Sequence, residues 1–529
     1  MRLEFEIWNL EFFFSVFLYT TDLMKIFSAT QIREADAYTI KHEPVSSLQL
    51  MERAAGACAQ WLMRHFDPSH PFYIFCGMGN NGGDGLVITR LLRDNGYQAT
   101  ACVLHHSDRP SADHTASRQA LEQVYPESLY DIHAITEFPV LPEGSIITDA
   151  IFGTGLSRPV EGWMAGIIHK LNDLQQRHTI VAIDLPSGMQ ADTSSLRTPV
   201  ICASHTLSFE VYKLALLLPE NAPCSGQVHI LPIGLHPDYI NHTPARFHVT
   251  DPHMIRTIYQ PRQPFAHKGT YGHALLIAGS YGKIGAAVLS ARACLHSGVG
   301  LLTCHVPQCG YQIIQVSAPA AMCITDPEET CSAHFHEELS AGGRPYKTIG
   351  IGPGLGTANG TAKALELLLA QYRQPMVIDA DALNIIAAYP FLLQRVPPGS
   401  LLTPHPKEFE RIFGSSENDF ERLELLSQQA VQLHLYILLK GRYTAIACPD
   451  GSIYFNSTGN PGMATGGSGD VLTGILTGLL AQGYAPKAAV LLGAYLHGLA
   501  GDIAAARMSQ EAMTAESIID CLGSAFLQL

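Results

Sequence analysis

The stretch N-P-G-M-A-T-G-G-S-G-D-V-L, from Asn460 to Leu472, decides how the second half of the chain folds. The small residues Gly466 to Gly469 stand directly before Asp470, and the apolar run that follows predicts a buried helix. Glycines let backbone N–H groups turn toward one point, where the start of a helix adds partial positive charge. The stretch therefore predicts an anion-binding loop with Asp470 as a general base beside a phosphate. A glycine-rich turn capped by Asp470 is the alternative.

The composition is that of a large globular chain with an acidic surface. The chain has 529 residues, a hydrophobic content of 47% and a formal net charge of -14. The length predicts two or more domains, and the negative charge disfavours nucleic acid or an anionic membrane as the main partner. A phosphate ligand must then be held by local N–H groups rather than by a basic surface.

The cysteine, histidine and apolar patterns bear on location and metal binding. The 12 cysteines are scattered without a C-x-x-C pair, which favours a reducing cytoplasm over a disulfide framework. The 24 histidines include no H-E-x-x-H and no Cys/His spacing typical of zinc sites. No uninterrupted apolar run reaches the roughly 18 to 20 residues that span a bilayer. We therefore predict a cytoplasmic protein with neither a membrane partner nor a local zinc motif.

The amino terminus carries an apolar run, Phe12 to Tyr19, that has the look of a short signal-peptide core. The residues before it hold one Arg and three Glu, and no small-residue cleavage site follows. A normal-looking domain begins at Met24. We predict that residues 1–23 are a non-native or disordered extension.

The first half of the chain alternates strands, glycine loops and helices. A strand over 72–76 runs into a glycine loop from Gly77 to Gly85, and an amphipathic helix follows. Further strands over 145–149 and 179–183 lead to Asp149 and Asp184. The carboxyl ends of strands in an open parallel sheet line the ligand crevice, so we expect these groups to form one site. Each aspartate taken alone is more readily explained as a helix cap.

Three motifs in this half, G-x-G-N-N-G-G-D-G, D-A-I-F-G-T-G-L-S-R and D-L-P-S-G, resemble the Rossmann-like epimerase domain of the NAD(P)H-hydrate repair proteins. We place this domain at residues 24–240. The resemblance implies that the hydrated dinucleotide is bound by Asn80, Asn81, Gly82, Gly83, Asp84, Gly153, Thr154, Gly155, Leu156, Ser157, Arg158, Pro159 and Asp184. It also implies a potassium site at Asn81, Asp149 and Ser187, whose oxygen atoms suit a hard cation. Asp184 is the catalytic candidate, and Tyr212-Lys213 replaces the Pro-Lys frequent in the family, which leaves the role of Lys213 open.

The second half restarts the α/β rhythm after a polar, proline-marked boundary near residues 236–248. The motifs G-S-Y-G-K-I-G-A-A, G-P-G-L-G, D-A-D-A-L, T-P-H-P-K-E and G-G-S-G-D follow in order. They resemble the ribokinase-like carbohydrate kinases, and more closely their dehydratase branch. We place an ADP-dependent NAD(P)H-hydrate dehydratase domain at residues 248–529.

This second resemblance implies a nucleotide-dependent site. It implies substrate contacts from Ala287, Gly356, His405 and Asp470, and adenylate contacts from Lys440, Gly441, Arg442, Tyr443, Thr444 and Gly469. His405, between two prolines, is also explained as a helix-start residue. Magnesium would screen the phosphates. Fused bacterial relatives use ADP and eukaryotic relatives use ATP, so we expect ADP, and the oligomers frequent in this branch make a homo-oligomer an expectation.

Together the two halves resemble the bifunctional NAD(P)H-hydrate repair enzymes. The implied fold is α/β with two three-layer αβα domains, the first Rossmann-like and the second ribokinase-like. The implied reactions interconvert the R and S epimers of NAD(P)H-hydrate and dehydrate the S form, with ADP converted to AMP and phosphate. A ribokinase-like sugar or vitamin kinase with an amino-terminal regulatory domain is the alternative, and a nucleotide-sensing binding module is a third hypothesis.

Overall fold

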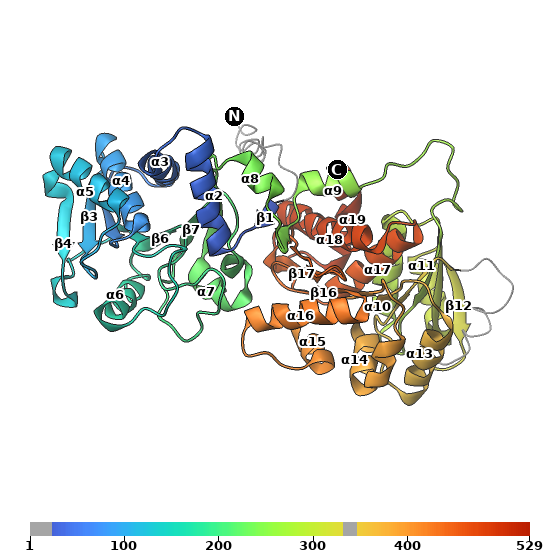
Figure 1. The fold of residues 1–529 in the computed structure, drawn as a ribbon. Coiled ribbons are helices and arrows are strands. Elements are labelled where there is room, and N and C mark those ends of the chain that lie inside the picture. Colours follow the sequence, from blue (N-terminus) through green and yellow to red (C-terminus); the bar gives the residue numbers. More distant parts are fainter. Residues whose placement is uncertain (1–23, 332–345) are drawn as a thin grey trace.

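The computed structural model describes residues 24–331 and 346–529, and the chain builds two α/β units (Figure 1). The expected extension at residues 1–23 lies outside the described residues. Each unit has a mainly parallel sheet with helices on both faces, which confirms the predicted fold class.

The first unit is a parallel sheet of seven strands in the order β4-β3-β2-β5-β6-β7-β8. Its helices and strands are α2 (Ala29–His42), α3 (Ser47–His65), β2 (Phe72–Cys76), α4 (Asn80–Asp94), β3 (Ala99–Leu104), α5 (Ala112–Val124), η1 (Pro126–Ser128), β4 (Leu129–Ile132), η2 (Ile135–Glu137), β5 (Ile146–Ala150), α6 (Gly162–Asn172), β6 (Thr179–Ile183), β7 (His205–Phe209), η3 (Leu214–Leu217), η4 (Pro219–Asn221), α7 (Ala222–Ser225), β8 (Gln227–Leu231) and α8 (Pro237–His242).

The central strands of this sheet are mostly apolar because both faces are covered. On β2, Ile74 packs into the cluster beneath α3 and α4, whereas the next residue, Phe75, packs with α6 on the other face. Successive side chains of a strand point to opposite faces, so a doubly covered strand has no polar positions to spare. Many of the polar and glycine residues lie near the carboxyl ends of the strands and in the loops after them, among them Asp149 near the end of β5.

The second unit is a sheet of eleven strands in the order β1-β9-β18-β17-β16-β15-β14-β13-β10-β11-β12. Its elements are β1 (Met24–Ile26), β9 (Phe247–Val249), α9 (Pro252–Ile258), β10 (His273–Ile277), α10 (Ile284–His296), β11 (Leu301–Pro307), η5 (Gln308–Gly310), α11 (Tyr311–Ser317), β12 (Met322–Asp326), β13 (Thr348–Ile351), α13 (Asn359–Gln371), β14 (Val377–Ile378), α14 (Ala380–Ala388), η7 (Pro390–Arg395), β15 (Leu401–Leu402), α15 (Pro406–Phe413), α16 (Asp419–Leu433), β16 (Tyr436–Leu439), β17 (Ala445–Ala447), β18 (Ile453–Phe455), η8 (Pro461–Met463), α17 (Ser468–Ala481), α18 (Pro486–Met508) and α19 (Ala515–Phe526).

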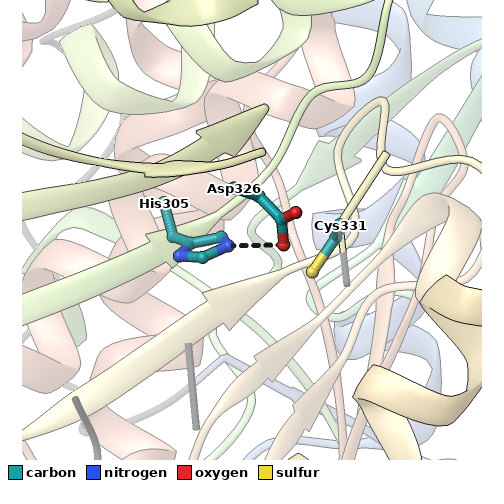
Figure 2. Close-up of side chains that lie close together, drawn as sticks. All are labelled: His305, Asp326 and Cys331. Carbon is teal, nitrogen blue, oxygen red and sulfur yellow. Dashed lines mark ion pairs between the residues drawn. The ribbon is translucent and has the colours of Figure 1, made fainter. Parts of the chain in front are cut away.

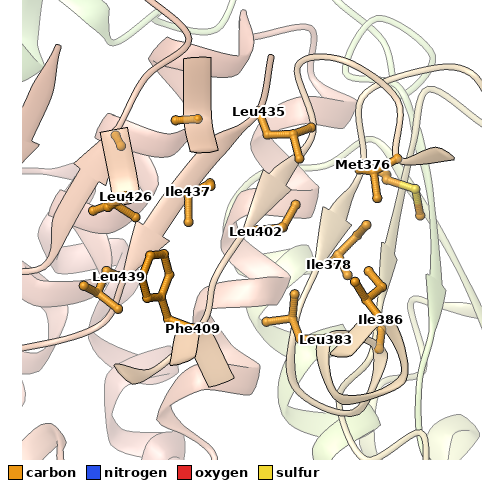
Figure 3. Close-up of a cluster of buried hydrophobic side chains, with 14 of the residues drawn as sticks. Met376, Ile378, Leu383, Ile386, Leu402, Phe409, Leu426, Leu435, Ile437 and Leu439 are labelled. Atoms are coloured by element: carbon orange, nitrogen blue, oxygen red, sulfur yellow. The ribbon is translucent and has the colours of Figure 1, made fainter. Parts of the chain in front are cut away.

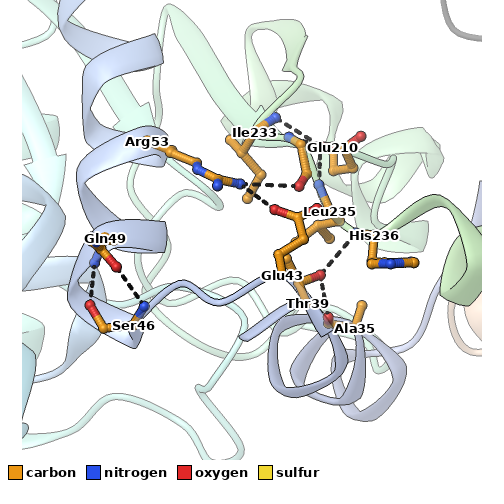
Figure 4. Close-up of polar contacts among 11 residues, drawn as sticks. Ala35, Thr39, Glu43, Ser46, Gln49, Arg53, Glu210, Ile233, Leu235 and His236 are labelled. Carbon is orange, nitrogen blue, oxygen red and sulfur yellow. Dashed lines mark hydrogen bonds and ion pairs between the residues drawn. The ribbon is translucent and has the colours of Figure 1, made fainter. Parts of the chain in front are cut away.

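Two hydrophobic layers enclose this second sheet. Ile378 and Leu402 face helices α13 to α16, and Figure 3 shows this layer, with Phe409 of α15 packed against the strands. The neighbouring residues Val377 and Leu401 face α17, α18 and α19 instead. The seven strands from β16 to β12 run parallel, and their carboxyl ends therefore meet along one edge.

Helix α18 is long and apolar enough to cross a membrane by length and composition. In the structure, 67% of its most apolar window is buried, and the helix packs against α17 and α19 in the core of the second unit. Its apolar character is therefore explained by its position in the hydrophobic layer.

The first strand crosses between the units. Strand β1 pairs antiparallel with β9 in the second sheet, although α2, which follows directly, belongs to the first unit. Lys25 Nζ of β1 donates to the carbonyls of Ile240, Asn241 and Thr243 at 2.9, 2.7 and 2.8 Å. Residues 24–26 thus contribute to the second sheet, whereas the expected boundary near residues 236–248 stays a prediction.

A second contact joins the units on another side. The backbone N–H of Glu220 donates to Asp419 Oδ2 at 2.7 Å, and the N–H of Asp419 donates to Glu220 Oε2 at 2.5 Å. Asp419 is the first residue of α16, where a carboxylate also interacts favourably with the helix dipole.

Two candidate active sites

A cavity of about 1100 Å³ lies at the carboxyl ends of β2, β5 and β6 in the first unit. Its size is at the upper end of small-molecule sites, as a dinucleotide requires. Most of the predicted substrate residues of this unit line it: Asn80, Asn81, Asp84, Gly153, Thr154, Gly155, Leu156, Ser157, Arg158, Pro159 and Asp184. Gly82 and Gly83 lie behind it in α4, where a Cβ would meet Gly77 O at 1.7 Å and Met51 Cε at 2.7 Å, respectively. These two glycines allow the helix to pack closely.

Asp184 lines this cavity in a strained backbone conformation. It has φ 67°, a left-handed value that non-glycine residues rarely adopt. Its Oδ2 accepts a hydrogen bond from Thr154 N at 2.9 Å, and its Oδ1 lies 3.0 Å from Lys213 Nζ. A Cβ on Gly153 would lie 2.7 Å from Asp184 Oδ2, so only glycine leaves room for the carboxylate. The loop and the strand end thus fix the orientation of this acid.

Asp36 and Lys213 are two residues of this site that the sequence did not assign. Asp36, on α2, lines the same cavity, and burial together with the charge of Asp184 raises its pKa to about 6. Lys213 Nζ also donates to Phe209 O at 2.9 Å. Asp36 and Lys213 therefore join Asp184 in the cavity, and two carboxylates beside an ammonium group can move a proton at a bound ring. Asp36 belongs to no glycine motif, so sequence inspection had no signal for it.

The predicted potassium ligands form a buried cluster beside the cavity. Ser187 Oγ donates to Asp149 Oδ1 at 2.5 Å, and Ser187 N donates to Asp149 Oδ2 at 2.7 Å. Burial raises the pKa of Asp149 to about 6. Asn81 Oδ1 is buried and accepts no hydrogen bond from the residues that the structure describes, although Asn81 Nδ2 donates to Ile183 O at 3.3 Å. A buried oxygen atom of this kind is suited to bind a cation. The potassium site itself stays a prediction.

In the second unit, the glycine loop ends at the start of α17, as the sequence predicts. Gly467 has φ 91°, which glycine adopts without strain, and Asp470 lies in the first turn of the helix. Burial raises the pKa of Asp470 to about 6; the charge of Asp379 adds to this shift and that of Lys440 opposes it. A carboxylate with this pKa is suited to act as a general base near neutral pH.

Asp379, at the end of β14, connects the residues around Asp470. Its Oδ1 accepts from Lys440 Nζ and its Oδ2 accepts from Thr473 Oγ1, both at 2.8 Å. The next residue, Ala380, has φ 47°, a second left-handed non-glycine position at a strand end. A Cβ on Gly469 would lie 3.2 Å from Lys440 Nζ, so the helix start and this lysine are immediate neighbours. The sequence identified the strand end but not this network.

Gly356 and Ala287 are two further residues for which the sequence implies substrate contacts. Gly356 has φ 78°, and its N–H donates to Asp381 Oδ2 at 2.8 Å. Ala287 is fully buried on α10 beneath Gly279. The predicted substrate contacts of both residues stay predictions.

His405 is the N-cap residue of α15. Its Nδ1 accepts from the N–H groups of Lys407 and Glu408 at 3.1 and 3.3 Å, and its own N–H donates to Glu408 Oε2 at 2.9 Å. The helix-start explanation is therefore observed. The side chain remains 43% exposed, so a substrate contact through Nε2 is compatible with the cap and stays a prediction.

The predicted adenylate segment, Lys440 to Thr444, forms a tight turn after β16. Thr444 Oγ1 donates to Gly441 O at 3.1 Å, and Arg442 donates to Gly459 O at 2.6 Å. Tyr443 packs against the hydrophobic layer beneath the sheet. The turn is held on both sides, and its role in adenylate binding stays a prediction.

Comparisons with known proteins agree with the two units. A family described as "NAD(P)H-hydrate dehydratase" matches residues 274–523, and one described as "YjeF-related protein N-terminus" matches residues 47–215. A crystal structure of the ADP/ATP-dependent NAD(P)H-hydrate dehydratase of Bacillus subtilis, co-crystallised with ATP/Mg2+, is 34% identical. It covers 52% of this chain and 96% of its own, with a TM-score of 0.46.

Relatives of known function match over nearly the whole length. The bifunctional NAD(P)H-hydrate repair enzyme Nnr of Moorella thermoacetica is 35% identical, over 94% of this chain and 96% of its own. The enzyme of the same name from Thermofilum pendens is 30% identical, over 96% and 97%. The chain therefore belongs to the family of bifunctional NAD(P)H-hydrate repair enzymes.

Proposed function

We propose that this protein repairs hydrated nicotinamide nucleotides at the two sites described above. The first unit interconverts the R and S epimers of NAD(P)H-hydrate, and the second dehydrates the S epimer to NAD(P)H while ADP becomes AMP and phosphate. The observation that carries the proposal is Asp470, a partly desolvated carboxylate in the first turn of α17, directly after a glycine loop. This geometry supports phosphoryl transfer to a hydroxyl group.

Asp470 would activate the hydroxyl of the hydrated ring in the second unit. As the carboxylate takes the hydroxyl proton, the oxygen attacks the terminal phosphorus of ADP, and the bond to the bridging oxygen breaks to release AMP. The phosphate ester then leaves with its bonding electrons, a ring proton is lost, and the double bond returns. The N–H groups of the loop would stabilise the developing charge, an effect of about 3 to 4 kcal/mol per donor in oxyanion holes.

The second unit would bind the nucleotide with positive groups rather than with free carboxylates. Lys440 Nζ lies beside Gly469 and is held by Asp379. Mg2+ would be held chiefly by the phosphates of the nucleotide and by water, because this ion keeps several waters in such sites. When bound, Mg2+ supplies charge neutralisation for the phosphates.

Asp184 would act on the hydrated ring in the first unit. Its carboxylate faces the cavity and is held by Thr154 N and by Lys213, so its position is fixed before the substrate binds. Asp149, Ser187 and Asn81 would hold a potassium ion, which supplies fixed positive charge beside the dinucleotide. Asp184 exchanges the proton that epimerisation requires.

Incubation with S-NADH-hydrate and ADP tests the proposal, with recovery of absorbance by the reduced nicotinamide ring as the readout. We expect recovery with ADP, and the same assay with ATP measures the nucleotide preference. The variant Asp470→Asn should lose this recovery but still interconvert the epimers. A sugar or vitamin kinase would leave the hydrate unchanged, and a binding module would bind it equally well with or without Asp470.

Location and assembly belong to the same proposal. We expect a cytoplasmic protein, because its substrates are coenzymes of metabolism, and a homo-oligomer built through the dehydratase unit. Light scattering of the purified chain measures the assembly directly, and a monomeric mass would contradict the second expectation.

A further inference from the structure

His305, Asp326 and Cys331 form a buried cluster at one end of the second sheet. His305 lies on β11, Asp326 ends the neighbouring parallel strand β12, and Cys331 follows in the segment after that strand. The exposed fractions of the three residues are 1%, 0% and 2%. Figure 2 shows the three side chains turned toward one another. Among the described residues, this is the group of His, Cys, Asp or Glu whose potential metal-ligand atoms lie within 4.8 Å of one another.

The spacing of this cluster fits one tetrahedral ion. His305 Nε2 lies 3.5 Å from Asp326 Oδ2. Two ligands at about 2.1 Å from a tetrahedral ion lie about 3.4 Å apart, which follows from usual zinc bond lengths. A thiolate and an imidazole on one zinc ion lie about 3.6 Å apart by the same geometry. The potential ligand atoms lie within 4.8 Å of one another, so the sulfur of Cys331 needs to move by about 1.2 Å at most to complete a three-ligand set.

The cluster borders the hydrophobic core of the second unit, because Cys331 packs in the same layer as Leu355 and Ile277. The carboxylate of Asp326 contacts His305 Nε2 and accepts a hydrogen bond from Glu328 N at 3.1 Å. Buried carboxylates are commonly paired or bound to a metal, and one ion could join this pair to the cysteine. Zinc accepts imidazole, carboxylate and thiolate ligands together, whereas the thiolate and the imidazole disfavour magnesium or calcium.

The cluster also lies next to the loop after β10, which includes Tyr281, and close to Gly356 of the candidate dehydratase site. Tyr281 N donates to Glu329 O at 3.0 Å, and Ala278 N donates to His305 O at 3.2 Å. Thr330 Cγ2 lies 3.9 Å from the position that a Cβ on Gly356 would take. An ion that ties Cys331 to the two strand ends would therefore hold residues 326–331 against this loop.

We propose that His305, Asp326 and Cys331 bind a zinc ion that stabilises the second unit, with the fourth position open to water or another donor. The ion is structural: the proposed general base, Asp470, and its partner Asp379 are not among its ligands. Sequence spacing could not reveal this site, because its residues come from two strands and a following segment and form no Cys/His motif.

Metal analysis of the purified full-length protein tests this proposal. After dialysis against metal-free buffer, we expect about one zinc per chain, because three protein ligands that include a thiolate and an imidazole should retain the ion. Replacement of zinc by cobalt should give the absorption bands of tetrahedral, thiolate-bound cobalt. Removal of the zinc by a chelator should lower the melting temperature of the second unit. This decrease should occur when neither NAD(P)H-hydrate nor nucleotide is present.

Two buried cysteines provide a matched pair of variants. Cys331→Ser should lose the zinc and the cobalt–thiolate band, with metal affinity reduced tenfold or more, since even outer-shell changes cost about 10–100-fold. Cys304→Ser is the control, because Cys304 is equally buried and precedes His305 but packs on the opposite face of β11. Should Cys331→Ser fail to fold, cobalt titration of the wild-type protein and of Asp326→Asn decides. Absence of zinc and of a cobalt spectrum in the wild type, or equal metal content in both cysteine variants, would overturn the proposal.

Discussion

Lys213 Nζ lies 3.0 Å from Asp184 Oδ1, with only 1% of the lysine side chain and 11% of the aspartate side chain exposed. The sequence left the role of Lys213 open, and this ion pair indicates that Lys213 pairs with the carboxylate of Asp184. Loss of one partner from a buried pair leaves the other charge uncompensated, which typically costs about 3 to 5 kcal/mol. The pair therefore connects the proposed catalytic residue Asp184 to the stability of the first unit.

We predict that Lys213→Met destabilises the first unit by about 3 to 5 kcal/mol in denaturant unfolding. It should also slow epimerisation more than tenfold, while dehydration of the S epimer continues. The double variant Lys213→Met/Asp184→Asn should regain part of the stability, because the orphaned charge is gone. Lys170→Met, at an exposed position on α6, is the control. Equal free energies of unfolding for Lys213→Met and Lys170→Met would contradict the ion-pair argument.

The pKa of Asp470 predicts the pH dependence of dehydration. A general base works in its deprotonated form, and burial raises the pKa of Asp470 to about 6. The value of kcat/KM should therefore be constant above pH 6 and fall about tenfold per unit below it. Circular dichroism over the same pH range controls for unfolding. A dehydration rate that stays constant as the pH falls through this value would exclude Asp470 as the base.

The sequence predicted the central strands because they are continuous apolar runs. The strands expected over 72–76 and 179–183 have these same bounds in the structure, and the strand expected over 145–149 spans Ile146–Ala150. It did not predict β1 or β9, because three-residue strands carry little periodicity and their partners are distant in the chain. Such strands are specified by tertiary pairing rather than by a local pattern.

The residues of the two candidate sites were likewise predictable only where the sequence pattern is local. Glycine loops after strands can be recognised locally, so the lining of the first cavity was largely predictable. Asp36 and Lys213 were not assigned, because they reach Asp184 only when α2 and the segment after β7 pack over the sheet. The same holds for the link from Asp379 to Thr473. Partners that meet only in the folded chain leave no signature in sequence order.

The cluster of Asn81, Asp149 and Ser187 predicts that potassium stabilises the first unit. A ligand that binds only the folded state adds about 2.7 kcal/mol at a concentration of 100 Kd. Calorimetry in potassium chloride and in an organic-cation chloride of equal ionic strength should show a higher melting temperature with potassium. Ser187→Ala should abolish most of this difference, whereas Ser208→Ala, at a buried serine on β7 of the same unit, should keep it. An equal potassium effect in both variants would place the ion elsewhere.

Strand β1 predicts where the chain can be shortened. A chain that begins at Met24 keeps the pairing with β9 and the three hydrogen bonds of Lys25 at the end of α8. A chain that begins at Ser28 loses both. Hydrogen bonds of charged groups contribute about 1.5 to 3 kcal/mol each, so the shorter chain should lose at least about 3 kcal/mol of stability.

Loss of β1 would also leave β9 as an open edge of the second sheet, and open edges favour aggregation. We therefore expect the chain begun at Ser28 to melt at a lower temperature and to aggregate, whereas the chain begun at Met24 behaves as the full-length protein. Lys25→Met in the full-length chain separates the two contributions, because it removes the three hydrogen bonds but leaves the strand in place. If both shortened chains melt at the same temperature, β1 contributes little to stability. The second sheet would then be stable from β9 onward without residues 24–26.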